Sequence, residues 1–330
     1  MKHLTFNTGR RKSRRGIGMV LLTVCIGFPV FGSGEQDGGL KWRQNGTAAA
    51  AVTGMSGRPQ VAVIPGTIEG LPVAAVEKNA FKNKGLTNAV IPQSVTEIGE
   101  SAFRGNALTA VDLPAGLIRL GAGAFDSNRL TGVIIPAGLK VIEGFTFRNN
   151  RLNAVALPGT VTAVEAYAFS GNQISGSIQL PRGIKTIGVS AFEKNQLTGT
   201  LEIPPSVTEI GAMAFSGNQL SGVTFSAGVA AIPAMAFSNN QLTTVTIAPS
   251  VAVIGERAFA FNQLSAVVIL DSVREIKKSA FGDNPVTSIA IGSDVTLHRT
   301  SFGNGFAAFY NRNGKKAGAY IFANGTWSMR

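Results

Sequence analysis

Ile203-Pro-Pro-Ser-Val-Thr-Glu-Ile-Gly-Ala-Met-Ala-Phe215 decides the fold, because the same stretch recurs as Ile91-Pro-Gln-Ser-Val-Thr-Glu-Ile-Gly-Glu-Ser-Ala-Phe103. Its final Phe returns at steps of 22 or 23 residues along most of the chain. A repeat of this period is typical of a solenoid, in which each unit packs only on its neighbours. We therefore expect one extended body in the 330 residues. The recurring residues are Phe81, Phe103, Phe125, Phe147, Phe169, Phe192, Phe215, Phe237, Phe259 and Phe281.

The whole unit reads Leu-x-x-Val-x-Ile-Pro-x-x-Val-x-x-Ile-Gly-x-x-Ala-Phe-x-x-Asn-x. Its first half has the spacing of a short strand, with Leu108, Val111 and Leu113 facing a core. Pro114 then ends the strand, because proline has no N–H for further pairing. The sequence thus predicts a β-rich solenoid, a right-handed superhelix of 22–23-residue coils with short parallel strands and little helix.

The second half of the unit supplies another inward set, shown by Leu117, Leu120 and Phe125. We expect Gly121 to permit a bend there. Because the Phe recurs once per coil at an inward position, the Phe column is predicted to form a stacked core spine rather than a ligand site.

An Asn follows the Phe by three positions in nearly every unit. A side chain repeated in each coil can bond the turn backbone of the coils beside it, and buried backbone groups need such partners. We expect a structural ladder rather than a set of active sites. Its members are Asn106, Asn128, Asn150, Asn172, Asn195, Asn218, Asn240, Asn262 and Asn284.

Two adjacent units are one residue longer than the rest, Ile174–Gln196 and Leu197–Gln219. The extra residue falls in Ser-Gly-Ser-Ile and in Thr-Gly-Thr-Leu, ahead of the middle strand position. These insertions predict a local bulge. Such a bulge is either decoration or part of a contact surface.

This repeat resembles the leucine-rich repeats of treponemal proteins and of BspA-like bacterial surface proteins, over about residues 60–304. Many relatives carry Cys where this chain keeps Asn. The resemblance implies an exported, non-enzymatic protein that binds other proteins, with relatives regarded as adhesins for host matrix proteins or partner bacteria. It also implies a degenerate first repeat that caps the solenoid, and no binding residue comes with it.

The predicted organisation has four parts. Residues 1–34 are a signal peptide, residues 35–85 an N-terminal cap with the degenerate first repeat, and residues 86–285 nine leucine-rich repeats. Residues 286–330 hold a last partial repeat and a terminal β-hairpin that covers the final coil, because aromatic and turn residues alternate there.

The signal peptide is predicted from a basic start and an apolar run, Ile17 to Phe31, that is shorter than a membrane span of roughly 20 residues. Small residues place the cleavage after Gly32 or Gly34. Lipid anchoring at Cys25 is the less favoured alternative, because bulky Val24 precedes it. We expect an exported protein, at the cell surface, secreted or periplasmic, with no stable membrane span after cleavage.

Charge and titratable residues exclude several classes of function. The net charge of +12 includes six basic residues of the signal segment, which leaves 24 basic against 18 acidic residues, or +6, over the rest. This is no nucleic-acid signature. His3 and His298 are the only histidines, so a metal centre or a catalytic triad lacks its nitrogen groups. We expect no enzyme activity, cofactor or metal.

The candidate site is the column of residues that should face outward from the strands, on a surface expected to be concave. Its carboxylates, Asp112 and Glu202, are four coils and so roughly 19 Å apart, whereas paired glycosidase carboxylates lie about 5–10 Å apart. We therefore predict a protein-binding face; the alternatives are an unused surface, an envelope scaffold that contacts the producer's own proteins, or a homo-oligomer interface. The candidate residues are Val90, Asp112, Ile134, Ala156, Gln179, Glu202, Thr224, Thr246 and Val268.

Overall fold

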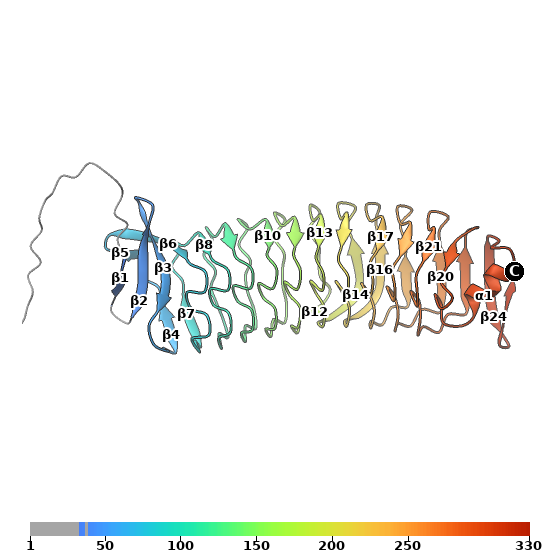
Figure 1. Cartoon of the computed structure of the whole chain (residues 1–330), viewed down its shortest axis with the longest axis horizontal. Coiled ribbons are helices and arrows are strands. Elements are labelled where there is room, and N and C mark those ends of the chain that lie inside the picture. The colour runs from blue at the N-terminus through green and yellow to red at the C-terminus, as the bar shows by residue number, and fades with distance from the viewer. Residues whose placement is uncertain (1–32, 37–38) are drawn as a thin grey trace, which may run out of the picture. The chain divides into compact units, whose positions relative to one another are not determined.

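The computed structural model describes residues 33–36 and 39–330. They belong to one of two compact units of the chain, Phe31–Arg330. The other unit, Met1–Val30, lies outside the described residues, and so do the signal segment up to residue 32, Cys25 and His3. The described unit is a β-solenoid of about 11 turns with coils of about 22 residues, which confirms the predicted fold class (Figure 1).

The N-terminal end of this unit is an antiparallel sheet that runs into the solenoid. Strand β1 pairs with β2 and β2 with β3, and β3 then lies parallel to β6, the first strand of the coils. The sheet covers one end of the core with Leu40, Trp42 and Val52, which are all buried. The bounds are β1 Ser33–Gln36, β2 Leu40–Asn45, β3 Ala49–Met55, β5 Thr67–Ile68 and β6 Leu71–Val76.

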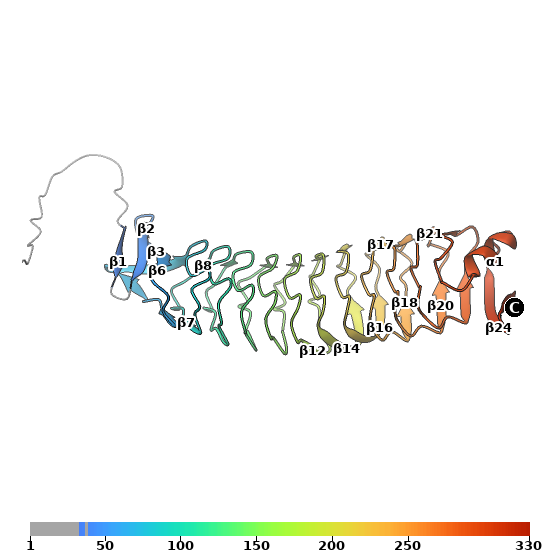
Figure 2. The same ribbon diagram turned by 60° about the horizontal axis from the view of Figure 1, so that its bottom comes forward.

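Short strands recur at two positions of the coil and so form two columns along the solenoid. Successive coils lie side by side in both views (Figures 1 and 2). The first column carries the candidate residues. Its strands are parallel where they pair, but not every coil contributes one. They are β4 Val61–Val63, β7 Asn88–Val90, β12 Ser175–Gly176, β14 Gln196–Ile203, β16 Gln219–Phe225, β18 Thr244–Thr246, β20 Ala266–Ile269 and β22 Ser288–Ile291.

The second column continues β6 with one two-residue strand in every coil. Each of these strands ends in a buried Ile, Leu or Val that faces the core. They are β8 Glu97–Ile98, β9 Arg119–Leu120, β10 Val141–Ile142, β11 Ala163–Val164, β13 Thr186–Ile187, β15 Glu209–Ile210, β17 Ala231–Ile232, β19 Val253–Ile254, β21 Glu275–Ile276 and β23 Thr296–Leu297.

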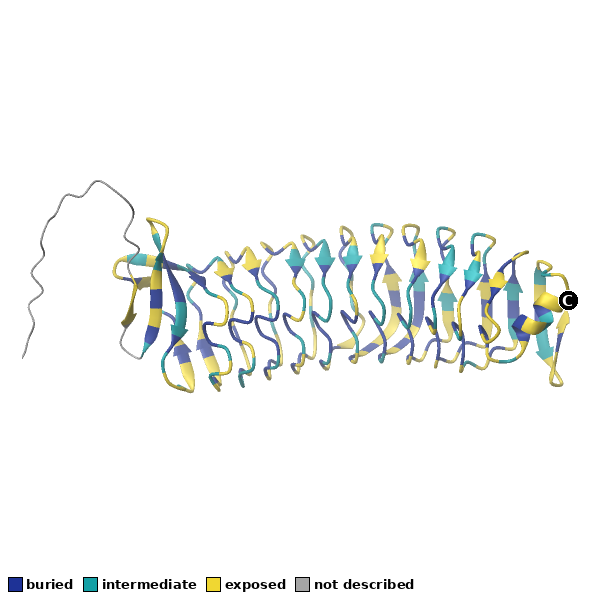
Figure 3. Cartoon of the chain, in the orientation of Figure 1, coloured by how far each residue is buried: buried dark blue, intermediate teal, exposed yellow. Residues whose placement is uncertain are grey.

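The Phe column forms the predicted spine between these two strand columns. All ten rings have no exposed surface, and Phe302, which the repeat pattern did not reveal, extends the stack by one ring. Successive rings lie 5.0 to 6.0 Å apart with their planes within 15°. Buried residues accordingly recur in every coil (Figure 3).

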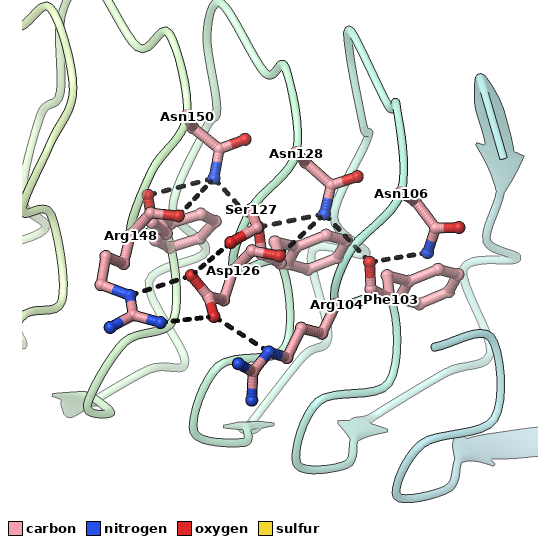
Figure 4. Close-up of polar contacts among 10 residues, drawn as sticks. Phe103, Arg104, Asn106, Asp126, Ser127, Asn128, Arg148 and Asn150 are labelled. Atoms are coloured by element: carbon pink, nitrogen blue, oxygen red, sulfur yellow. Dashed lines mark hydrogen bonds and ion pairs between the residues drawn. The ribbon is translucent and has the colours of Figure 1, made fainter. Parts of the chain in front are cut away.

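The Asn ladder is also confirmed. Asn128 Nδ2 donates to the carbonyl oxygens of Phe103 (2.9 Å) and Phe125 (3.1 Å), and its Oδ1 accepts from the N–H of Leu108 (3.1 Å). The other eight Asn residues make the same three kinds of bond, and Figure 4 shows Asn106, Asn128 and Asn150 in a row. Each Asn therefore joins two coils through groups that would otherwise be buried without partners.

Gly121 lies where two adjacent coils approach each other closely. Its φ is not positive, and a Cβ at this position would lie 2.4 Å from the backbone nitrogen of Glu100. A glycine here lets the backbones of adjacent coils approach closely, although Glu143 and Glu165 stand at the same point of their coils. Gly99, Gly188 and Gly211 stand at the same point of their coils with equally short approaches.

The predicted bulge lies where the inserted residues fall. The register between β14 and β16 shifts between Gly199 and Thr200, and Gly199 has a φ of 75°. Gly176, at the same place in the preceding coil, has a φ of 74°. A glycine in this left-handed region is the usual way to accommodate one extra residue in a strand.

The C-terminal end is closed by a helix and a hairpin. The hairpin, β24 Gly318–Ala323 and β25 Thr326–Met329, was predicted, and Asn324 and Gly325 form its two-residue turn with positive φ. Strand β24 pairs antiparallel with β22 and so covers the last strand of the first column. Helix α1, Phe306–Arg312, was not predicted; its buried Phe306 contacts the ring of Trp327 at 4.8 Å.

Candidate functional site

The structure places all nine candidate residues on the outward side of the first strand column. Eight of them are exposed, Ile134 most of all at 86%, and Thr224 is half-buried. Where strands are present the row is continuous, since Glu202 lies opposite Thr224 and Thr224 opposite Thr246. The expected column is therefore a real surface, although its coils differ in structure.

Four coils of this column are open, in the sense that their backbones do not pair. The strand expected over Leu108 to Leu113 is not formed, and the next three coils likewise carry no strand beyond their first positions. Pairing between coils stops at Thr131, Asn153 and Ser175. Beyond these positions, the backbone N–H and C=O groups of four segments have no hydrogen bond within the described part of the chain. We call the four the open segment: residues 110–113, 132–135, 154–157 and 177–180.

Core side chains are partly uncovered in the open segment. Its half-buried residues are Leu113, Val133, Val155, Leu157, Ile178 and Leu180, all of which pack on the core from inward positions. In the paired segment, which comprises strands β14, β16, β18, β20 and β22, the matching residues are almost fully buried, for example Leu201 at 1% and Ile289 at 0%, except Val245, which is half-buried. The open segment therefore exposes more of its inward aliphatic side chains than the paired segment does.

This apolar surface is hollowed. A depression of about 580 Å³ is lined by residues 110–113, 132–134 and 153–156, and a smaller one of about 280 Å³ adjoins it over residues 88–91, 93 and 110–112. Val90, Asp112, Ile134 and Ala156 of the candidate column line these two depressions. Asp112 is the single charged residue among their linings. A shallow, nearly uncharged hollow of this kind suits apolar side chains of another protein.

The sequence gives a partial reason for the open segment. Its coils carry Asp112, Ala156 and Gln179 at the outward position, where the paired segment carries Thr224, Thr246 and Val268. Thr and Val favour strands, whereas Asp and Ala disfavour them. Ile134 of the open segment does not follow this trend, and neither do Glu202 and Ala290 of the paired segment, so propensity alone does not account for every coil.

A polar cluster on another side of the coils was missed by the sequence reasoning. The carboxylate of Asp126, with 1% of its side chain exposed, accepts two hydrogen bonds from Arg148, at 3.0 and 2.9 Å, and forms an ion pair with Arg104 at 3.1 Å (Figure 4). The hydrogen bonds to Asp126 raise the pKa of Arg148 above its ordinary value. The signal was present in the residue that follows each Phe, which reads Arg104, Asp126 and Arg148 in three successive units.

Among the described residues there is no group of three or more His, Cys, Asp or Glu side chains placed to hold a metal ion. His298 is exposed, and its Nδ1 lies 3.3 Å from the hydroxyl of Thr300. No helix in the described ranges has the length and apolar character needed to cross a membrane.

The fold and its open face define a leucine-rich repeat protein, a class whose members bind other proteins. The model of the BspA type leucine-rich repeat region matches six copies over residues 74–198 and 197–311, so the chain belongs to this family. No curated protein matches the chain.

Two solved structures share the fold. A leucine-rich repeat protein from Bacteroides ovatus is 19% identical with a TM-score of 0.51, and the alignment covers 83% of this chain and 89% of that one. The pneumococcal vaccine antigen PcpA is 18% identical with a TM-score of 0.54, over 80% of this chain and 82% of the other. At this level of identity, the likeness concerns the fold.

Proposed function

We propose that this chain is an exported interaction protein that acts at the cell surface and adheres to host matrix proteins or to partner cells through the open segment. The half-buried core side chains of the four open coils carry this proposal. Apolar surface that extends over several coils is characteristic of protein interaction sites. The partner would place its own apolar side chains over Val133 and Val155 and bond the unpaired backbone groups beside them.

A binding assay with two matched substitutions tests the surface. Ile134→Glu puts a charge into the open segment, and Val268→Glu puts the same charge at the equivalent exposed position of the paired segment. Immobilised collagen, laminin and fibronectin serve as probes. We expect saturable binding to at least one of them, weakened about tenfold or more by Ile134→Glu and unchanged by Val268→Glu. Equal losses in both variants, or none in either, would rule out the open segment as the binding surface.

The location is tested separately, because an envelope scaffold that contacts the producer's own proteins would need the same fold. Protease added to intact cells should degrade a surface protein and spare a periplasmic one. Complete protection, with degradation only after the cells are lysed, would exclude adhesion and favour the scaffold. A covalent fatty acid on Cys25 would show the lipid anchor that we regard as the lesser alternative.

A further inference from the structure

A second hollow of about 430 Å³ shares no residue with the open segment. It is lined by Glu100, Ser101, Arg104, Ala122, Gly123, Asp126, Phe145 and Arg148. The hollow exists because of one glycine in a column of residues with positive φ. Gly123, with a φ of 62°, stands between Ser101 and Phe145, and a Cβ built on it would touch nothing closer than 3.6 Å.

The charge around this hollow is not balanced. Asp126 and Arg148 already form a two-bonded pair, in which one carboxylate neutralises one guanidinium. Arg104 reaches the same carboxylate only as an ion pair and has no other side-chain partner in the described residues, while 44% of its side chain is exposed. Glu100 is paired with Lys78 at 2.7 Å. Three cations therefore face two carboxylates, and the excess charge falls on Arg104, whose outer N–H groups have no side-chain acceptor among the described residues.

One wall of the hollow is aromatic. The ring of Phe145, 36% exposed, lies parallel to the ring of Tyr167 at 5.0 Å, and the guanidinium of Arg148 lies 4.7 Å from its centre. Both rings stand in the positive-φ column, at 62° and 60°. This backbone conformation is costly for bulky side chains. Nearly every coil has a residue of this conformation at the same point, for example Met213 and Arg257. What distinguishes the hollow is therefore the exposed ring of Phe145 beside Arg148.

We propose that this hollow binds a uronic acid residue of an acidic polysaccharide. The carboxylate pairs with Arg104, whose planar fork matches it. The apolar C–H face of the sugar lies against Phe145, and its hydroxyls bond to Glu100 and to the hydroxyl of Ser101. An acidic protein segment offers the carboxylate but not the flat ring with one apolar and one polar side.

Calorimetric titration of the purified protein with trigalacturonate tests the proposal, with its methyl ester as a probe of the same shape without charge. We expect trigalacturonate to bind and the ester to bind at least about tenfold more weakly. No binding at about 10 mM, or equal binding of the ester, would overturn the proposal. A Glu-rich heptapeptide that binds as tightly as trigalacturonate would also overturn it, and would assign the hollow to acidic protein segments.

Three variants show whether binding occurs in this hollow. Arg104→Gln removes the free charge but leaves the Asp126–Arg148 pair, and Phe145→Ser removes the ring at a position where Ser101 and Ser190 show that serine fits. Gly123→Phe fills the hollow by extending the stack of Phe145 and Tyr167. Each should weaken binding of trigalacturonate about tenfold or more. Arg119→Gln, an exposed arginine paired only with Glu97, is the control and should change nothing.

Unaltered thermal unfolding of the variants shows that the loss is not a folding defect. If Gly123→Phe does not fold, the other two variants still decide the question. Unchanged affinity in both Arg104→Gln and Phe145→Ser would place the binding elsewhere and end the proposal.

Discussion

Residues 110–180 and residues 196–291 are built from the same repeat, yet their outward faces differ. In the first region the coils pair only at the start of the first strand column and most of their inward aliphatic residues are half-buried, whereas in the second they pair along it and all such residues except Val245 are buried. The Phe spine and the Asn ladder pass through both regions without interruption. Pairing in the first column is thus not what closes a coil, and this leaves the first region free to use its face for contact.

The largest effect should come from the Asn ladder, and it should be equal in the two regions. Asn150→Ala and Asn240→Ala each remove two bonds to Phe carbonyls and one from a backbone N–H. Buried backbone groups without partners cost about 1–3 kcal/mol each, so we expect the free energy of unfolding to fall by about 3 kcal/mol or more. Chemical denaturation of the two variants measures this fall in the free energy of unfolding. A loss below about 1 kcal/mol for Asn150→Ala alone would mean that the open coils are loose through to the core.

Hydrogen exchange should separate the two regions next. The amides of Val133 and Val155 have no hydrogen-bond partner within the described chain, whereas Val223 and Val245 lie in paired strands. We expect the first two amides to exchange at least about a hundredfold faster, which corresponds to roughly 2–3 kcal/mol of local protection. Equal protection in both regions would show that the first column pairs throughout in solution.

These differences mark the limit of what the sequence predicts. The spine, the ladder, the bulge at Gly199 and the terminal hairpin follow from residues that recur at fixed positions or form a recognised turn, so pattern reasoning finds them. The open segment does not, because Val133 and Val223 carry the same signal and strand propensity at the outward position separates their coils only in part. Both residues stand at the same place in the repeat.

The polar cluster of Asp126 was not predicted from the sequence for a different reason. The cluster is formed by three residues at the same repeat position in successive units, Arg104, Asp126 and Arg148, which lie 22 residues apart. Their residue types do not recur at that position in the other units, so the repeat pattern does not point to them. The positions that follow Phe169, Phe215 and Phe237 all hold a buried serine. A charged residue in such a column requires a partner in the next coil, and this is the signal to look for in repeat proteins.

A smaller effect is expected from two equivalent glycines. A Cβ on Gly222, in the paired segment, would lie 2.9 Å from Thr200 Oγ1 and 3.0 Å from Thr244 Oγ1, whereas a Cβ on Gly132 would meet nothing within 4 Å. Gly132→Val should therefore be neutral or stabilising, and Gly222→Val should be less favourable by about 1 kcal/mol. Thermal unfolding of the two variants compares them. The same change in both would mean that the open coils are as crowded as the paired ones.

The smallest effect concerns the end at which the paired segment meets the C-terminal cap. Burial raises the pKa of Tyr310 and of Tyr320 above their ordinary value of 10.0, and both rings have no exposed surface. The stability that they contribute is complete below that value and is lost as the pH rises through their raised folded-state pKa, because unfolding then releases protons.

Alkaline unfolding should thus begin at β22, β24 and α1 and reach the open segment last. Hydrogen exchange followed from pH 8 to 11 would show the order, and the double variant Tyr310→Phe, Tyr320→Phe should flatten the pH dependence, although it also loses the bonds to Gly292 and Lys316. If exchange at alkaline pH instead accelerates first around Val133, the open coils and not the cap are the weak point of the solenoid, and the uncovered apolar surface there would reflect low local stability rather than a site kept for a partner.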